Sequence, residues 1–183
     1  MSGGRRIGWR VAYFFAAFGV YLVDQATKAW AVRRLRDGET VTLIGGFLDL
    51  TYAENPGIAF GQLQEGGSFG RWALVGLAVA AGVCVLVYLF RSARTDDRVL
   101  GACALLLAGI AGNLTDRARF GFVIDFILLH YKSFHWPVFN VADMSICAGA
   151  FLLIYDIFVT GRDERRKKKA GEVVAAKSEA PTN

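Results

Sequence analysis

The run from Trp72 to Phe90 limits the folds open to this chain more than any other segment, because it contains no charged residue. A helix over this run is about 28 Å long, close to the ~30 Å hydrocarbon core of a bilayer. Of the 183 residues, 54% are hydrophobic and 20% are charged; soluble domains average about 45–50% and about 25%. We therefore predict an all-α membrane protein with four transmembrane helices, at about residues 9–30, 72–90, 99–116 and 138–159.

The basic residues predict the orientation of these spans. Most of the 21 Lys and Arg residues lie in the N-terminus, in the loop after the second span, and after the fourth span. The positive-inside rule then places both termini in the cytoplasm. Arg33, Arg34 and Arg36 fall on the opposite side, where lipid phosphates are candidate partners.

The chain divides into a membrane domain at residues 1–162 and a basic tail at residues 163–183, for which the composition predicts disorder. A basic run directly after an apolar helix is typical of a cytoplasmic flank near anionic lipids. No aromatic and basic interleaving is present, so nucleic acid is not an expected partner.

The first span has an alternative interpretation as a cleaved signal peptide, with Ala29-x-Ala31 as the cleavage motif. Against this, Asp24 and Lys28 are four residues apart and therefore lie on one helical face, where they can pair. A signal peptide has no need of such a pair.

The segment between the first two spans predicts a small extracytoplasmic β-sheet. Residues 40–43 and 48–52 alternate between polar and apolar, and Gly45-Gly46 suits the turn between them. A turn-rich segment, Glu54-Asn55-Pro-Gly57-Ile-Ala-Phe60-Gly, follows. This sheet is a candidate for contact with a substrate, and an ordinary linker is the alternative.

Two aspartates near apolar stretches, Asp125 and Asp143, call for a reason. A charged group at the bilayer centre costs about 2.5 kcal/mol or more. On the predicted topology further polar residues gather at the same outer ends of the spans: Asp24, Lys28, Asn55, Asn113, Asp116, Arg117 and Asn140. Structural roles are alternatives for several of them. Asp143 can cap a helix, Asp116 can form a structural ion pair, and Asn113 and Asn140 can bond helices together.

Three kinds of chemistry fit these carboxylates. Two aspartates that share a proton can hydrolyse a peptide with an activated water. A metal-dependent enzyme acting on lipid phosphates is a second possibility, although a paired Asp-x-x-Asp is missing. A non-enzymatic, proton-coupled transporter subunit is the third. We predict no metal site, since His130 and His135 lack ligand spacing and the three cysteines form no Cys-x-x-Cys pair.

Five segments in order carry a resemblance to a known family. They are Asp24-Gln-Ala-Thr-Lys28, Asn55-Pro-Gly57-Ile-Ala-Phe60, Gly112-Asn113-Leu-Thr-Asp116-Arg117, Val123-Ile-Asp125-Phe126 and Phe139-Asn140-Val-Ala142-Asp143. Together, on four spans, they resemble the bacterial lipoprotein signal peptidases, or signal peptidase II.

The resemblance implies an aspartic endopeptidase of the bacterial inner membrane that needs no cofactor. It implies cleavage of diacylglyceryl-modified prolipoproteins before the lipidated cysteine, inhibition by globomycin-type compounds, contact with membrane lipids, and a monomer. The catalytic pair maps onto Asp125 and Asp143, near the extracytoplasmic face. The supporting and substrate-binding residues map onto Asp24, Lys28, Asn55, Gly57, Asn113, Asp116, Arg117 and Asn140.

Overall fold

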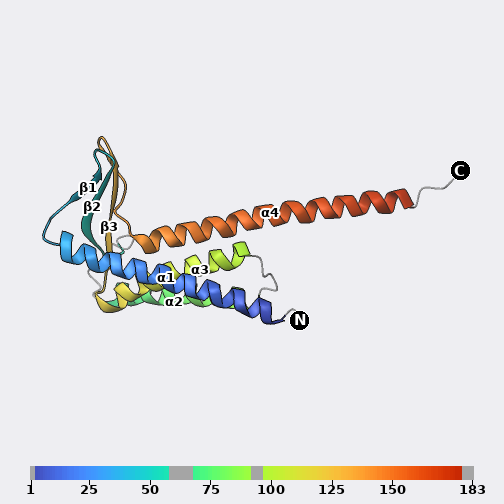
Figure 1. Cartoon of the computed structure of the whole chain (residues 1–183), viewed down its shortest axis with the longest axis horizontal. Helices are drawn as coiled ribbons and strands as arrows, with labels where there is room; N and C mark the ends of the chain where they lie inside the picture. The colour runs from blue at the N-terminus through green and yellow to red at the C-terminus, as the bar shows by residue number, and fades with distance from the viewer. Residues whose placement is uncertain (1–2, 58–67, 92–96, 179–183) are drawn as a thin grey trace.

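Four long helices and one antiparallel sheet make up the part of the chain that the structure describes (Figure 1). The structure is a computed structural model that describes residues 3–57, 68–91 and 97–178. The helices are α1 (Gly3–Leu35), α2 (Ser68–Arg91), α3 (Asp97–Arg119) and α4 (Val141–Ser178). The turn-rich stretch predicted after Gly57 falls mostly at residues 58–67, outside the described residues.

Three of the described helices are long and apolar enough to cross a membrane: Gly70–Arg91, Asp97–Arg119 and Val141–Arg162. Their positions agree with three of the predicted spans. Large apolar side chains such as Leu77 and Phe151 are about two-thirds exposed to the surroundings of the bundle, as expected where lipid covers them. The chain is thus a multi-pass membrane protein. Helix α1 covers the first predicted span, at 9–30, but among the described residues it is not one of the helices that are apolar enough to cross a membrane by length and composition alone.

Helix α3 contacts each of the other three helices. Its packing against α4 is close because glycines face the partner backbone. A Cβ on Gly149 of α4 would lie 2.8 Å from the Ala102 carbonyl oxygen. Helix α4 continues to Ser178, so residues 163–178, predicted to be disordered, are helical here. Their Ala, Glu, Lys and Arg residues favour helix and extend one that is already nucleated.

The sheet has four strands in the order β1-β2-β3-β4: β1 (Val41–Ile44), β2 (Leu48–Asn55), β3 (Val123–Tyr131) and β4 (Phe134–His135). The two strands predicted between the first two helices are confirmed. The predicted placement of the sheet between the first two helices is incomplete, because β3 and β4 come from between α3 and α4. Strand β3 was not recognised from the sequence, because Val-Ile-Asp-Phe-Ile-Leu-Leu is nearly all apolar and lacks the alternation of polar and apolar residues that marks a strand.

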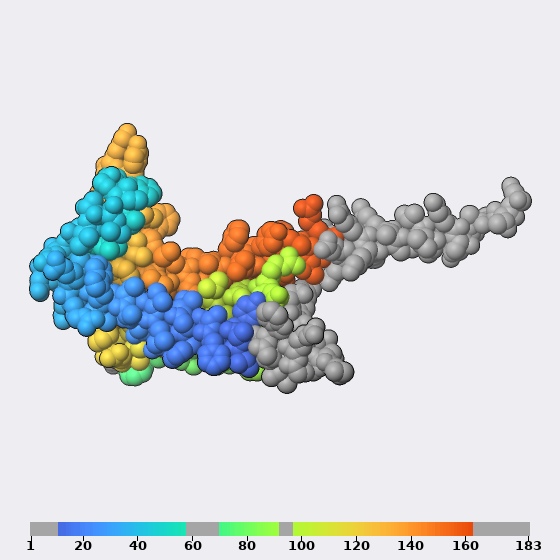
Figure 2. Space-filling model, viewed as in Figure 1, coloured from blue at the N-terminus to red at the C-terminus, as the bar shows by residue number. Residues whose placement is uncertain are grey.

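The sheet lies across one end of the bundle and projects beyond it to one side (Figures 1 and 2). A small core joins it to α1, made of Ala31, Leu35 and Phe126 with Leu50 and Ile127 packed around them. The start of α1 and the end of α4 lie at the opposite end (Figure 1). This arrangement brings the last turns of α1 and α3, the first turn of α4, and strands β2 and β3 together at the sheet end.

Candidate active site

Strand pairing fixes the position of Asp125. Strand β3 runs antiparallel to β2, with Asp125 opposite Ala53 and Val123 opposite Asn55. Asn55 is therefore a diagonal neighbour of Asp125 on the same face of the sheet. Its Nδ2 donates a hydrogen bond to Asp125 Oδ2 at 2.9 Å. The Asp125 residue is 2% exposed, so its carboxyl group meets these protein donors instead of bulk water.

The first turn of α4 fixes the position of Asp143. Phe139 pairs with Ile127 of β3, so the chain enters α4 directly beside the sheet. Asn140 then caps the helix, its Oδ1 accepting a hydrogen bond from the Asp143 backbone N–H at 2.9 Å. Asp143 Oδ2 accepts one in return from the Asn140 backbone N–H at 3.2 Å. This reciprocal pair is a capping box, and the capping role predicted as an alternative for Asp143 is present.

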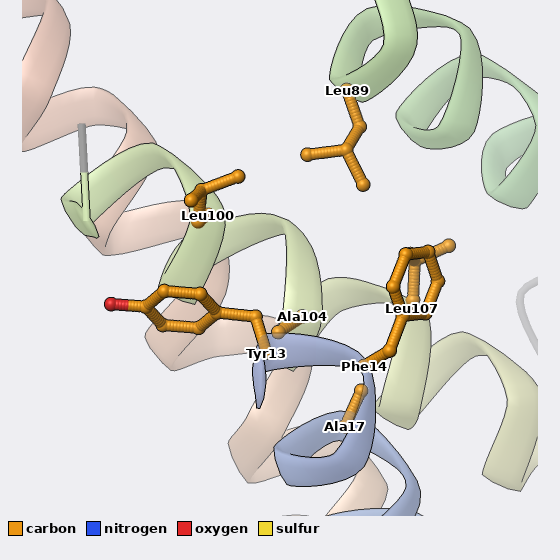
Figure 3. A pocket seen from close by; sticks show the side chains of 7 residues that line it. All are labelled: Tyr13, Phe14, Ala17, Leu89, Leu100, Ala104 and Leu107. Carbon is orange, nitrogen blue, oxygen red and sulfur yellow. The ribbon is translucent and has the colours of Figure 1, made fainter. Parts of the chain in front are cut away.

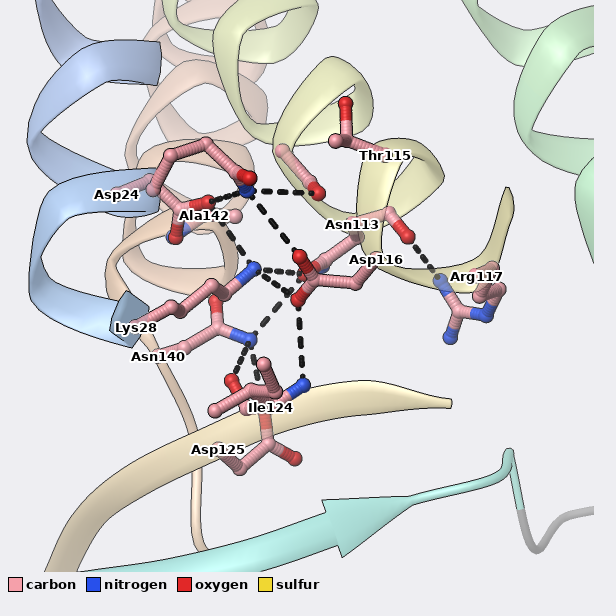
Figure 4. Close-up of polar contacts among 12 residues, drawn as sticks. Asp24, Lys28, Asn113, Thr115, Asp116, Arg117, Ile124, Asp125, Asn140 and Ala142 are labelled. Carbon is pink, nitrogen blue, oxygen red and sulfur yellow. Dashed lines mark hydrogen bonds and ion pairs between the residues drawn. The ribbon is translucent and has the colours of Figure 1, made fainter. Parts of the chain in front are cut away.

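Two asparagines link the carboxyl groups of Asp125 and Asp143. Figure 4 shows the Asp125 side of this link, where Asn140 bonds both Asp125 and Asn113. Asn140 Nδ2 donates to Asp125 Oδ1 at 2.6 Å. Asn113 Nδ2 donates to Asp143 Oδ1 at 2.8 Å, and its Oδ1 accepts from Asn140 Nδ2 at 3.2 Å. Asn140 thus touches Asp125 with its side chain and Asp143 with its backbone. Segments far apart in sequence meet here through amide groups that donate and accept at once.

A buried lysine of α1 joins α1 to α3 beside this pair. Lys28, 2% exposed, lies 3.0 Å from Asp24 Oδ2 and 2.8 Å from Asp116 Oδ2. Its ammonium also donates to Asn113 Oδ1 at 3.1 Å. The predicted pairing of Asp24 with Lys28 on one face of a helix is confirmed. Three partners around one ammonium supply the hydrogen bonds that a buried charge requires.

The carboxylates of this lysine cluster also bind backbone amides that position the catalytic candidates. Asp24 Oδ1 accepts a hydrogen bond from Ala142 N at 2.8 Å, which satisfies a free N–H in the first turn of α4. Asp116 Oδ2 accepts one from Ile124 N at 3.2 Å, next to Asp125. Both contacts therefore act on residues adjacent to Asp143 and Asp125.

Arg117 and Gly57 lie at the edge of the same network. Arg117 interacts electrostatically with Asp143, Asp125 and Asp116, and its buried Nε has no hydrogen-bond partner among the described residues. Gly57 donates its N–H to Asn55 Oδ1 at 2.9 Å and has a φ of 86°, a left-handed conformation that glycine adopts readily.

Sequence comparisons agree with this geometry. The profile of the family described as Signal peptidase (SPase) II matches residues 16–159. A "Lipoprotein signal peptidase" of Cellvibrio japonicus is 40% identical over 147 residues, which cover 80% of this chain and 86% of the relative. One from Pseudoalteromonas atlantica is 40% identical over 148 residues, covering 80% and 88%. The chain belongs to the signal peptidase II family. It is accordingly a protease, as the resemblance in sequence implied.

Two solved structures that resemble this chain in fold are described as bacterial membrane enzymes. One superposes with a TM-score of 0.72 at 28% identity, covering 82% of this chain and 93% of the other. A second has a TM-score of 0.69 at 27% identity, covering 88% and 92%. The overall arrangement of helices and sheet is therefore shared with proteins of low sequence identity.

The carboxyl groups of Asp125 and Asp143 have different surroundings. Burial raises the pKa of Asp125 to about 6, although the Asn55 hydrogen bond lowers it; the nearby Asp143 charge raises it further, and Asn140 lowers it. Asp143 instead lies in the first turn of α4, where the helix dipole favours a negative charge. Asp125 therefore keeps its proton to a higher pH than an ordinary aspartate does.

All ten site residues predicted from the sequence lie in or beside one network. Two residues of this network were missed. Gln25 Nε2 donates to Asp24, Asp116 and the Gly112 carbonyl. The one sequence signal for a role of Gln25 was its position inside the Asp24–Lys28 motif. Arg71 of α2 donates its Nε to the Arg117 carbonyl at 2.9 Å, and no motif pointed to it. In the described parts of the chain no three His, Cys, Asp or Glu side chains group as metal ligands.

Proposed function

We propose that this chain cleaves diacylglyceryl-modified prolipoproteins before the lipidated cysteine, with Asp125 and Asp143 as the catalytic pair. Membership of the signal peptidase II family supports removal of the signal peptide from prolipoproteins. The observation that carries the assignment of the pair is the contact of one residue, Asn140, with both carboxyl groups. This contact holds the two acids beside each other on different elements, as a shared-proton mechanism requires.

The reaction follows from the surroundings of the two acids. The ionised Asp143 takes a proton from a water molecule, whose oxygen attacks the scissile carbonyl carbon. The protonated Asp125 gives its proton to the carbonyl oxygen, so the intermediate is a neutral tetrahedral diol. The C–N bond then breaks as Asp143 returns its proton to the leaving amine, and Asp125 regains one from the diol hydroxyl. Both acids end in their starting states.

The supporting residues divide by what they touch. Asp24, Lys28 and Asp116 position backbone amides next to the catalytic pair, and Asn113 and Asn140 hold the carboxyl groups. We assign substrate contacts to Arg117, whose Nε is free among the described residues, and to the Asn55–Gly57 turn at the end of β2. Arg117 is partly exposed, and its guanidinium group can donate to a carbonyl oxygen of the signal peptide.

The proposed topology has four spans, with α1 as the first. Helix α1 supplies Asp24 and Lys28 to contacts with α3 and α4, so cleavage after Ala31 would remove part of the site. The start of α1, the segment from Arg91 to Arg98 between α2 and α3, and the end of α4 carry most of the basic residues. We therefore place both termini in the cytoplasm of a bacterial inner membrane and the catalytic pair near the extracytoplasmic face. All site residues come from one chain, so a monomer suffices.

A cleavage assay tests this proposal. Purified protein in lipid is incubated with a diacylglyceryl-modified prolipoprotein, with the unmodified precursor, with EDTA, and with a globomycin-type inhibitor. We expect cleavage of the modified precursor alone, unaffected by EDTA and blocked by the inhibitor. Loss of cleavage with EDTA would support the metal-dependent alternative. No cleavage by folded protein, together with proton flux in vesicles, would support the transporter alternative.

A further inference from the structure

Two hollows lie one after the other along the crevice between α1 and α3. The first, of about 270 Å³, is near the sheet end. It is lined by Gln25, Lys28, Ala29, Val32 and Arg33 of α1, by Asp116 and Arg119 of α3, and by Phe120 and Ile124, which follow α3. The second, of about 480 Å³, continues toward the other end of the helices and is lined by Phe18, Tyr21, Leu107, Ala111 and Thr115, with Leu86 of α2 opposite. The two linings share no residue but follow one another along α1 and α3, and we refer to the two hollows together as the α1–α3 groove.

The two parts of the groove differ in chemistry. The part near the sheet end has two guanidinium groups, those of Arg33 and Arg119. The other part is almost wholly apolar, and only the Tyr21 and Thr115 hydroxyls, which bond each other at 3.3 Å, are polar. Beyond it a smaller, again apolar pocket shares Phe14, Ala17 and Leu107 with the groove (Figure 3). The groove is thus amphipathic along its length.

The two arginines of the groove, Arg33 and Arg119, differ from the nearby Arg34 and Arg36 in whether they have a carboxylate partner among the described residues. Arg34 pairs with Glu39 at 3.4 Å, and Arg36 approaches Glu54 at 4.0 Å. Arg33 donates only to the Ala29 carbonyl, and Arg119 lies over the Phe120 ring. In the part of the chain that the structure describes, neither Arg33 nor Arg119 forms an ion pair with a carboxylate. Among the described residues, the sheet end of the groove therefore carries two guanidinium groups without a carboxylate partner, beside the buried Lys28–Asp116 ion pair.

The dimensions of the groove match one leaflet of a membrane. From Arg33 to Phe18 the helix rises about 22 Å, at about 1.5 Å per residue. Half of a bilayer with its headgroups is about 20–22 Å thick. A phosphate beside Arg33 and Arg119 would thus place an acyl chain against Tyr21, Phe18 and Ala111.

We propose that the α1–α3 groove binds a single anionic glycerophospholipid, with its phosphate between Arg33 and Arg119 and one acyl chain in the apolar hollow. The lining of the groove does not include Asp125 or Asp143, although the buried Lys28–Asp116 pair lies at its sheet end, and the proposal does not depend on the cleavage reaction. The occupant is a membrane lipid instead of free phosphate, because a free phosphate would leave the apolar hollow empty, whereas the acyl chain of a lipid would fill it.

Native mass spectrometry of the full-length protein in detergent tests this proposal with phosphatidylglycerol as the probe. The test variant is Arg33→Gln/Arg119→Gln, and Arg34→Gln/Arg36→Gln is the matched control with the same change in charge. We expect lipid affinity to fall about tenfold or more in the test variant and less than twofold in the control. An equal fall in both variants, or no retained lipid on the wild type, would overturn the proposal.

Variants that fill the apolar hollow separate a lipid from a free anion. Ala111→Phe and Leu86→Trp narrow the hollow from opposite walls, and their thermal unfolding shows whether each is folded. We expect at least one folded variant to bind phosphatidylglycerol several-fold more weakly, and inorganic phosphate at millimolar concentration not to displace the lipid. Displacement by phosphate with unchanged binding in both filled variants would show an anion site without an acyl chain, contrary to the proposal.

Discussion

At the residue scale, the two oxygens of Asp125 accept hydrogen bonds from different asparagines. Asn140 reaches Oδ1 from the start of α4, and Asn55 reaches Oδ2 from the end of β2. Burial raises the pKa of this carboxyl group to about 6, and the two amide donors act in the opposite direction. Together these effects leave Asp125 protonated at mildly acidic pH and determine the pH at which the aspartate pair loses its shared proton.

The first prediction concerns the alkaline side of the pH profile. An acid that must be protonated loses activity as pH rises through its pKa, so kcat/KM of the wild type should fall with an apparent pKa near 6. Asn55→Ala removes a donor that lowers this pKa, so its alkaline limb should move to higher pH. Tyr52→Phe, which removes a hydroxyl bonded to Glu54 on the same strand, should leave the limb in place. A limb that moves to lower pH in Asn55→Ala would contradict the assignment.

The second prediction concerns Asp116, which contacts Lys28, Gln25 and the Ile124 N–H. These contacts are structural, so Asp116→Asn should lower the free energy of unfolding by about 1–3 kcal/mol while leaving measurable cleavage. The exposed Asp37→Asn serves as the control for lost charge and should change neither property. The measurements are thermal unfolding and cleavage rate. A fully stable Asp116→Asn protein without any cleavage would mean that this residue takes part in the reaction.

At the element scale, close packing of α3 against α4 brings Asn113 within reach of Asp143. Gly109 lies against the Ala142 backbone, and Gly112 lies against the Asp24 carboxylate and Ala142. Small residues at membrane helix interfaces allow this approach. The distance between the helices is thus set by the same residues that flank the site.

A third prediction tests this packing. A Cβ at Gly109 would run into the Ala142 carbonyl oxygen, which is backbone and cannot turn aside. Gly109→Ala should therefore displace the first turn of α4, lower the unfolding temperature and cut cleavage at least tenfold. Gly76→Ala in α2, where no atom lies within 4 Å of an added Cβ, is the matched control. Equal unfolding temperatures and equal cleavage rates of the two variants would show that the close approach of α3 and α4 is not required for stability or cleavage.

At the scale of the whole molecule, the apolar runs predicted the helices well. The runs at 72–90 and 99–116 lie inside α2 and α3, and α4 begins three residues after the predicted start. Strand β3 was not predicted, because burial on both faces removes the alternation that marks a strand. The helical continuation to Ser178 was not predicted, because the prediction used only the polar and charged composition of this segment. It did not take into account that the segment directly follows a helix.

The candidate site was predicted in its residues but not in its contacts. Motifs identified Asp125 and Asp143, yet nothing in their spacing shows that they meet. Their proximity depends on the register of β3 against β2 and on the bridge from Phe139 to Ile127, which are both tertiary features. Arg71 could not be found at all, since its partners are backbone carbonyl groups of α3, which carry no sequence signal.

The most direct test of the central claim is single-turnover cleavage by Asp125→Asn and Asp143→Asn beside the wild type. Each variant keeps the size of the side chain and removes the proton exchange, so each should lose at least a thousandfold in rate while its unfolding temperature stays within a few degrees. Asp49→Asn, on the same sheet but outside the network, controls for the loss of an acid and should cleave. Near wild-type cleavage by either Asp125→Asn or Asp143→Asn would contradict the aspartate pair.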